Sequence, residues 1–559
     1  MVVRQLLTGI GAGAVLALLA LFLTIPRSSI EHALPHWVRD ALPEGKPLEQ
    51  SAQAATIESQ PVSGKGVEEQ HPEAAAEGEP RSLQASDERG VRVAGWGAGA
   101  AQESQPEPAV EGGLQPDQVP PLEPDLYLGA LSKQTIIRAR PDHDARILGF
   151  ARTGALLSRA RESSGKAGCS GGWYRVEPDG YICVGRAATL DMDHPLLRLA
   201  SFQPDRTLPM PYIYGTSRFP TPPLYTRIPS LEQQQIAEQD LAKHRAKNFG
   251  SLWADAADTP APALLAGGAR IPRPYGYPQL EREFMTGRAL ASSAFAFIDL
   301  FEQDGRRWGL TADLSLLPLD RLTQVEESEF FGQVLDEEAS LPVAFVRAYN
   351  QHYFERIEGG GLRPTRAIGY RQAFQLTGRS ETAFGTKYFE TVEGGFIADH
   401  PRLVMIEKRE SMPKWAKEDR SWLEVSILNQ TLVAYRGSKP VFATLVSTGK
   451  DGLGDPETSH STATGIFLIH TKHVTSSMSG DEADDEFDLR DVPYVQYFHG
   501  GFAFHAAFWH DSFGQPRSHG CVNLSPADAR HLFSLTEPAV PLRWHSALSR
   551  SGTLAYVHP

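Results

Sequence analysis

Cysteine is scarce in this chain of 559 residues, which contains three of them: Cys169, Cys183 and Cys521. Positive charge is also in deficit, because 54 Lys and Arg residues are outnumbered by 68 Asp and Glu residues, for a formal net charge of −14. Without a basic surface to neutralise phosphates, we expect no nucleic-acid partner. We likewise predict no metal site and no cofactor.

Charge is absent from one long segment, Leu6–Ile25, which follows Arg4. A run of about 20 apolar residues can cross a bilayer as a helix, and the basic flank favours a cytoplasmic N-terminus. A cleaved signal peptide is the alternative. Because no small-x-small cleavage site follows the run neatly, we favour an uncleaved membrane anchor. Either way, we expect the rest of the chain to be exported.

Large apolar residues are few between about Ser51 and Pro121, where Ala, Glu, Gln, Pro, Gly and Ser dominate. Such a segment cannot bury enough surface to offset its ordering entropy, so we predict a disordered tether. The chain is too long for one ordinary domain. We divide it into an anchor or signal segment (1–30), a tether (31–122), a small β-barrel (123–195), an accessory region (196–415) and a β-rich C-terminal domain (416–546).

Short alternating runs with Gly, Pro and Asp between them characterise residues from Leu126 to about Leu190. Trp173-Tyr174 and Gly180-Tyr181-Ile182 predict a hairpin, which resembles the end of a bacterial Src-homology-3-like barrel. Cys169 and Cys183 flank this hairpin. In an oxidising compartment they either pair as a disulfide or remain two small buried hydrophobic residues.

The same spacing recurs later, where Tyr388-Phe389 precedes Gly395-Phe396-Ile397. We interpret it as a possible second barrel of the same kind, near the end of the accessory region. Chance likeness between hairpins is the alternative. Between the two, we predict one helix, from Leu231 to Asn248, polar on most faces and lying on the surface.

A thiol and three imidazoles gather in a short segment near the C-terminus: His505, His510, His519 and Cys521. A helix is predicted shortly after the thiol, because Ser525-Pro526-Ala527-Asp528 combines an N-cap, a proline at N1 and an acidic N3 residue. A thiol upstream of a helix N-terminus and near imidazoles has surroundings that lower a cysteine pKa. A buried structural cysteine beside satisfied histidines is the alternative.

This segment resembles the L,D-transpeptidase catalytic (YkuD) family. The family signature is a His, a spacer, and then Ser/Thr-His-Gly-Cys with Asn or Arg two residues on. The chain supplies these residues in order, as His505, Ser518, His519, Gly520, Cys521 and Asn523. It departs from the pattern in two places. Ala506-Ala507 replaces the usual Gly-Ser/Thr, and Ala463 stands where a Pro is typical. The likeness spans about residues 418–546.

The resemblance implies a mainly β chain. It predicts an L,D-transpeptidase-type β-sandwich catalytic domain, with a short helix after the nucleophile and small β-barrel-like accessory domains before it. Cys521 would attack a peptidoglycan tetrapeptide stem and hold it as a thioester, with His505 as proton acceptor and donor. His519 would shape the loop and support the oxyanion site. The backbone N–H groups of Gly520 and Cys521 would be the oxyanion donors.

Other residues receive secondary roles. Ser518 and Asn523 are expected to position the reacting residues rather than to contact the substrate. His510 and Tyr494 either line the substrate groove or are, respectively, a surface histidine and a packed aromatic. The acidic run Asp481–Asp488 is predicted to be a solvated flap beside the active site rather than a calcium loop.

Partners follow from the same resemblance. We expect peptidoglycan stem peptides as substrate, another stem or an anchored cell-envelope protein as acceptor, and the membrane through the N-terminal helix. The location would be the bacterial cell envelope, extracytoplasmic (periplasmic), with an inner-membrane anchor. An L,D-carboxypeptidase that uses water, or a non-catalytic cell-wall-binding scaffold, are the alternatives.

Overall fold

The computed structural model describes residues 122–246, 253–254, 259–277, 283–337, 340–417, 419–480 and 487–559. These residues all belong to one compact unit, 93–559. The predicted anchor at Leu6–Ile25 and nearly all of the predicted tether lie outside the described residues. Within the described ranges, none of the helices combines the length and the apolar character that a bilayer crossing requires.

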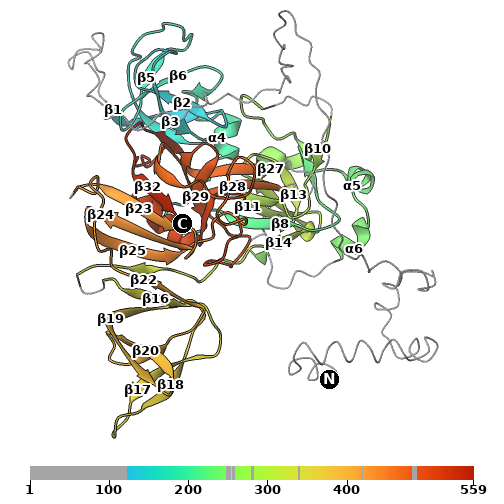
Figure 1. Cartoon of the computed structure of the whole chain (residues 1–559). Coiled ribbons are helices and arrows are strands. Elements are labelled where there is room, and N and C mark those ends of the chain that lie inside the picture. Colours follow the sequence, from blue (N-terminus) through green and yellow to red (C-terminus); the bar gives the residue numbers. More distant parts are fainter. Residues whose placement is uncertain are drawn as a thin grey trace, which may run out of the picture. The chain divides into compact units, whose positions relative to one another are not determined.

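Strands dominate the described part of the chain, which confirms the mainly β prediction (Figure 1). The helical elements described are short. They are α4 (Pro195–Leu199), α5 (Leu231–Ala237), α6 (Leu241–Arg245), α7 (Pro526–Leu535) and the 3₁₀ turns η4 (Ala263–Gly268) and η5 (Leu319–Arg321).

The first described segment, residues 122–189, is here called the N-terminal module. Its strands are β1 (Leu122–Ala130), β2 (Thr135–Arg138), β3 (Ile147–Ala151), β4 (Leu156–Ala160), β5 (Trp173–Arg175), β6 (Tyr181–Cys183) and β7 (Ala188–Thr189). They pair as the sheet β4-β1-β7 and as the run β3-β2-β6-β5 at one end of a larger sheet. Because this pairing is that of open sheets, the Src-homology-3-like barrel stays a prediction. The disulfide alternative is confirmed, since Cys169 and Cys183 are bonded.

A second module occupies residues 343–406 and has its own seven-stranded sheet. Its strands are β16 (Val343–Val346), β17 (Gln351–Arg356), β18 (Leu362–Ile368), β19 (Gln372–Ala383), β20 (Thr386–Thr391), β21 (Phe396–Ala398) and β22 (Leu403–Ile406).

The sequence echo between the two modules corresponds to one hairpin register. In β5–β6, Trp173 pairs with Cys183 and Tyr174 with Ile182. In β20–β21, Tyr388 pairs with Ala398 and Phe389 with Ile397. Both turns close with the same backbone bond, from Val176 N to Gly180 O at 2.8 Å and from Thr391 N to Gly395 O at 2.9 Å. The repeated spacing therefore encodes the same local structure twice.

The region between the modules is also β-rich. Its strands are β8 (Ile213–Ser217), β9 (Pro223–Tyr225), β10 (Met285–Arg288), β11 (Ala294–Gln303), β12 (Arg306–Thr311), β13 (Leu316–Pro318), β14 (Leu322–Gln324) and β15 (Gln333–Val334).

The single helix predicted from Leu231 to Asn248 is wrong. The chain forms α5 and α6 instead, separated by an αL residue at Asp240. Glu238, at the break, is buried and accepts hydrogen bonds from Arg306 and Arg321. These buried ion pairs fix Glu238 outside the helical conformation, which sequence periodicity cannot show.

The C-terminal domain is a sandwich of two sheets. One face contains β23 (Ser421–Ser426), β24 (Thr431–Arg436), β25 (Lys439–Leu445), β26 (Gly465–Leu468) and β32 (Leu554–His558). The other contains β27 (Thr471–Gly480), β28 (Phe487–His499), β29 (Phe502–Ala506), β30 (Val522–Leu524) and β31 (Ser546–Leu548).

One apolar core lies between these sheets. Val425 and Leu432 from the first sheet share a cluster with Phe504 and Val522 from the second, and with Leu532 of α7. The sheet also continues beyond the predicted domain end at residue 546, because β32 pairs with both β23 and β26. The second sheet also continues into the parts of the chain that precede the domain. β28 pairs with β11 of the accessory region, and β31 pairs with β3 of the N-terminal module.

Candidate active site

His505 and Cys521 lie on neighbouring parallel strands. His505 is in β29, and Cys521 directly precedes β30, with Phe504 paired to Val522 and His505 to Asn523. Extending this register by one residue aligns Cys521 with Ala503. Because alternate residues of a strand share a face, Ala503 and His505 point to the same side, and Cys521 joins them there. The Cys521 thiol and the His505 imidazole therefore lie on the same face of the sheet, on adjacent strands and offset by two residues.

Gly520 is required by the turn that presents Cys521. Its φ is +119°, and a Cβ there would lie 2.1 Å from Phe502 Cε1. A side chain would therefore have to displace an aromatic ring while adopting a disfavoured backbone conformation. Glycine is the residue that fits at this position of the Ser-His-Gly-Cys sequence.

Ser518 and Thr462 hold the same turn in place. Ser518 Oγ accepts the Gly520 N–H at 3.1 Å and donates to the Cys521 carbonyl oxygen. Thr462 Oγ1 donates to the Gly520 carbonyl oxygen at 2.8 Å. Ser518 therefore holds this turn, and its role in catalysis stays a prediction; sequence analysis missed Thr462. The Gly520 N–H, predicted as an oxyanion donor, is already engaged by Ser518. The oxyanion role of the Cys521 N–H stays a prediction.

His505 is neutral at rest. Its side chain is buried, which lowers its pKa to about 4. Its Nδ1 lies 3.0 Å from the Ala506 carbonyl oxygen. Because a carbonyl oxygen can only accept, Nδ1 carries the proton and Nε2 presents a lone pair. This tautomer is the one that can accept a proton from a thiol.

Cys521 is also neutral at rest. Its side chain is partly buried, with Sγ 3.8 Å from the Gly501 carbonyl oxygen, and burial raises its pKa to about 11. The predicted lowering of the thiol pKa is therefore wrong. The physical reason is that burial disfavours the thiolate, while β30 separates Cys521 from α7. The helix begins at Pro526, with Ser525 Oγ accepting the Asp528 N–H as predicted, and so the thiol is not in its first turn.

The loop between β29 and Ser518, here called the 507–517 loop, covers the histidine. The Trp509 ring stacks on the His505 ring with 5.7 Å between centroids. His510 Nδ1 accepts the Ser512 N–H, so its Nε2 carries a proton. That nitrogen lies 3.0 Å from Asn523 Nδ2, while Asn523 Oδ1 is buried without a partner. Exchanging the amide oxygen and nitrogen of Asn523 supplies the acceptor that His510 needs.

Asp511 anchors the 507–517 loop to two segments that sequence analysis did not connect with the site. Arg371, in the turn between β18 and β19, donates to the Asp511 carboxylate and to its carbonyl oxygen. Ser328 Oγ donates to the other carboxylate oxygen at 2.6 Å. The Arg371 guanidinium also lies over the rings of Phe330 (4.7 Å) and Phe513 (5.7 Å). These contacts lower the Asp511 pKa, against the effect of burial.

Two other predicted site residues, Tyr494 and His519, have different surroundings. Tyr494 is the packed aromatic of the two alternatives, because its side chain is 1% exposed and its hydroxyl donates to the Leu208 carbonyl. His519 is exposed. Its ring contacts those of His460 (4.9 Å) and Phe487 (5.1 Å), and Lys450 Nζ lies 3.5 Å from its Nε2. The oxyanion role of His519 stays a prediction. Most of the acidic run, residues 481–486, lies outside the described residues.

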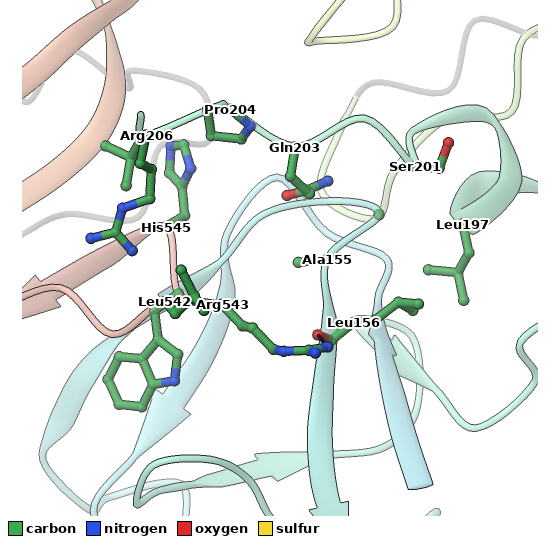
Figure 2. Close-up of a pocket in the computed structure, with 13 residues that line it drawn as sticks. Ala155, Leu156, Leu197, Ser201, Gln203, Pro204, Arg206, Leu542, Arg543 and His545 are labelled. Carbon is green, nitrogen blue, oxygen red and sulfur yellow. Dashed lines mark hydrogen bonds between the residues drawn. The ribbon is translucent and has the colours of Figure 1, made fainter. Parts of the chain in front are cut away.

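A cavity of about 290 Å³ lies between the N-terminal module and the C-terminal domain (Figure 2). None of the predicted site residues lines it. Its arginines are already engaged, since Arg206 donates to the carbonyl oxygens of Val540 and Pro541, and Arg543 to that of Leu156. The arginines of this cavity therefore join the C-terminal domain to segments that precede it in the chain.

Comparisons with known proteins agree with the geometry. Residues 420–543 match the L,D-transpeptidase catalytic domain family, YkuD. No curated protein matches the chain. The catalytic domain of the L,D-transpeptidase from E. faecium is 22% identical over 25% of this chain and 98% of that chain, with a TM-score of 0.20. The L,D-transpeptidase from Mycobacterium smegmatis is 16% identical over 43% of this chain and 90% of that chain, with a TM-score of 0.21.

Likenesses at this level carry no functional argument by themselves. The family match does more, because it covers the segment that contains His505, Ser518, Gly520 and Cys521. The C-terminal part of the chain is therefore an L,D-transpeptidase-type catalytic domain. What it transfers, and to which acceptor, has to be inferred from the site.

Proposed function

We propose that this chain is a peptidoglycan L,D-transpeptidase that uses Cys521 as nucleophile and His505 as general base and acid. The observation that carries the proposal is the placement of both residues on one face of the parallel pair β29–β30, inside the matched segment. The disulfide between Cys169 and Cys183 supports an extracytoplasmic, cell-envelope location, because disulfides persist in oxidising compartments.

The chemistry follows from the protonation states. His505 Nε2 takes the thiol proton as Sγ attacks the peptide carbonyl of the tetrapeptide stem, so that no ion pair has to exist beforehand. The imidazolium then protonates the amine of the departing D-alanine, and the stem remains as a thioester. An amine of a second stem or of an envelope protein attacks the thioester carbonyl, the C–S bond breaks, and the thiol is restored.

Substituting Cys521 and His505 separately tests this mechanism. In the full-length protein, Cys521→Ala should abolish both the acyl-enzyme mass and product formation from a tetrapeptide stem. His505→Gln should fold but lose about 10² to 10⁴ in rate, the usual contribution of general acid–base catalysis. Normal turnover in Cys521→Ala would overturn the cysteine mechanism. His352→Gln is the matched control, because His352 is an exposed histidine of β17 outside the predicted site, and it should retain the activity of the parent.

The pH dependence gives an independent check. The folded pKa of His505 is about 4, so its imidazole can accept the thiol proton at any pH well above that value. Acylation should therefore fall as the pH drops through about 4, once the imidazole is protonated. An acid limb centred near the ordinary histidine pKa of about 6.5 would contradict this assignment. If only the tripeptide product accumulates while added amines are ignored, the acceptor is water and the enzyme is an L,D-carboxypeptidase.

A further inference from the structure

A second cavity, of about 310 Å³, lies beside the catalytic histidine. It is lined by Thr216, Ser217, Ser292, Val325, Glu326, Phe508 and Trp509. Trp509 is the residue whose ring stacks on His505, so one wall of the cavity is in direct contact with the general base. Val325, Trp509 and Cys521 also pack against the same apolar cluster. The cavity therefore lies next to the general base, with the Trp509 ring between them.

The opposite wall comes from outside the matched catalytic segment. Thr216 and Ser217 are in β8, which pairs with β14 just before Val325 and Glu326. Val325 continues this pairing, because its N–H donates to the Tyr214 carbonyl oxygen at 2.9 Å. The Tyr214 and Phe508 rings, 4.5 Å apart, join this wall to the 507–517 loop. The cavity is therefore an addition that the accessory region makes to the catalytic domain.

The position of the cavity wall is fixed by well-formed contacts. Ser328, two residues after Glu326, donates to Asp511 of the 507–517 loop. Arg371 binds the same carboxylate from the second module. Glu326 and Trp509 consequently stand on segments that are bonded to each other, which is the rigidity that a binding site requires.

The chemistry of the lining fits a primary ammonium group. Glu326 supplies a carboxylate, and it takes part in none of the hydrogen bonds or ion pairs of the described residues. Trp509 supplies an aromatic ring, and the combination of a carboxylate with an indole attracts cations. The hydroxyls of Thr216 and Ser292 can accept the remaining N–H groups.

We infer that this cavity is the acceptor site, where Glu326 and Trp509 bind the ammonium form of the amine that resolves the thioester. This inference rests on the proposed function. The bound ammonium releases its proton to solvent, and the free amine then attacks the thioester carbonyl. The C–N bond forms as the C–S bond breaks, and His505 carries the amine proton to the departing thiolate. Glu326 is a specificity determinant for charged amines and takes no part in acylation.

The experiment uses the full-length protein, a tetrapeptide stem as donor and a second stem with a free amine as acceptor. Glu326→Gln should raise the KM for the acceptor about 5- to 10-fold, because a charge-assisted hydrogen bond is lost from a partly solvated site. Added salt should weaken acceptor binding in the parent and much less in Glu326→Gln. Glu329→Gln is the matched control, since Glu329 is exposed in the same acidic stretch and lies outside the cavity lining.

A second acceptor separates charge recognition from folding. Hydroxylamine, an amine nucleophile that is uncharged at neutral pH, should resolve the thioester equally well in the parent and in Glu326→Gln. An unchanged KM for the charged acceptor, or an equal loss with hydroxylamine, would overturn the acceptor site alone. A parent that acylates but only hydrolyses its thioester would overturn it too. A parent that forms no acyl-enzyme would overturn the proposed function itself.

Discussion

The two β modules share a hairpin but are joined to the catalytic domain in different ways. The N-terminal module is joined through Arg152, which forms a bidentate ion pair with Asp491 of β28. The second module uses Arg371, which binds Asp511 of the 507–517 loop. Each module therefore contributes one arginine to one aspartate of the domain. One aspartate belongs to the framework of the sheet and the other to the loop over His505.

Burial separates the two pairs further. The side chains of Arg152 and Asp491 are 8% and 5% exposed, whereas Asp511 is 56% exposed although Arg371 is 7% exposed. Thr475 Oγ1 donates to the Asp491 carboxylate at 2.8 Å, and Tyr214 donates to its carbonyl oxygen at 2.7 Å. A fully buried pair is expensive to break, while a half-exposed one mainly restricts the conformation of the groups that it joins. We therefore expect the first arginine to contribute mainly to stability and the second mainly to activity.

The largest effect should come from breaking the buried pair. Arg152→Met leaves Asp491 buried without its cation, which typically costs about 3–5 kcal/mol. We expect a large fall in the thermal unfolding midpoint of the full-length protein and little soluble protein at higher temperature. Arg161→Met is the control from the same module, because Arg161 pairs with Glu123 at the surface and its loss should barely move the unfolding midpoint. Equal stability of the two variants would refute the distinction.

The next effect should be on turnover. Arg371→Met removes one of the two side chains that hold the Asp511 carboxylate, so we expect Trp509 to be held less firmly against His505, and small misplacements at a reacting centre can cost about 10²-fold in rate. We expect kcat/KM for stem transfer to fall by about that factor while the unfolding midpoint moves little.

Two further variants discriminate a positioning role from a structural one. Arg371→Lys should recover only part of the activity, because an ammonium cannot make both bonds of the guanidinium fork. Arg379→Met, a change at an exposed arginine of the same module, should behave like the parent. Arg371→Met could instead lower stability and leave kcat/KM of the folded fraction intact. Both arginines would then contribute to stability alone, and the proposed difference between them would be wrong.

Local patterns predicted much of the catalytic domain. The alternation of Leu423 and Val425 and the turn at Asn429-Gln430 correspond to the β23–β24 hairpin, and Ser525 caps α7 as expected. The pair His505 and Cys521 could be proposed because each lies in a short, recognisable sequence. All these signals act over a few residues of the chain.

The features that the sequence did not reveal are non-local. Arg371 and Asp511 are 140 residues apart, and Arg152 and Asp491 are 339 apart. A single sequence has no signal for such pairs, since many arginines and aspartates are equally suitable. The neutral state of Cys521 was missed for the same reason, because its pKa is set by burial under segments distant in sequence. The break between α5 and α6 depends on ion pairs of Glu238 that also arise only in the folded chain.

The smallest expected effect is a change in how stability depends on pH. Arg152 is the leading cause, opposing burial, that lowers the pKa of Asp491 to about 2, from an ordinary value of 3.8. A depressed carboxyl pKa contributes stability that is present above the unfolded pKa and lost as the pH falls through the folded pKa. The parent should therefore lose about 2 kcal/mol between about pH 4 and pH 2 from this group.

In Arg152→Met this contribution is missing, so the difference in stability between the parent and the variant should narrow as the pH falls through that window. His545, whose pKa is lowered to about 3, faces the same pair, and Tyr212 and Tyr214 stay neutral there. Urea unfolding of both proteins at pH 7 and at pH 3 measures the narrowing directly. Arg371→Met should show a smaller narrowing, because Asp511 is half exposed and solvent screens its attraction to Arg371. A constant difference between the parent and Arg152→Met at both pH values would show that Asp491 does not depend on Arg152 for its charge.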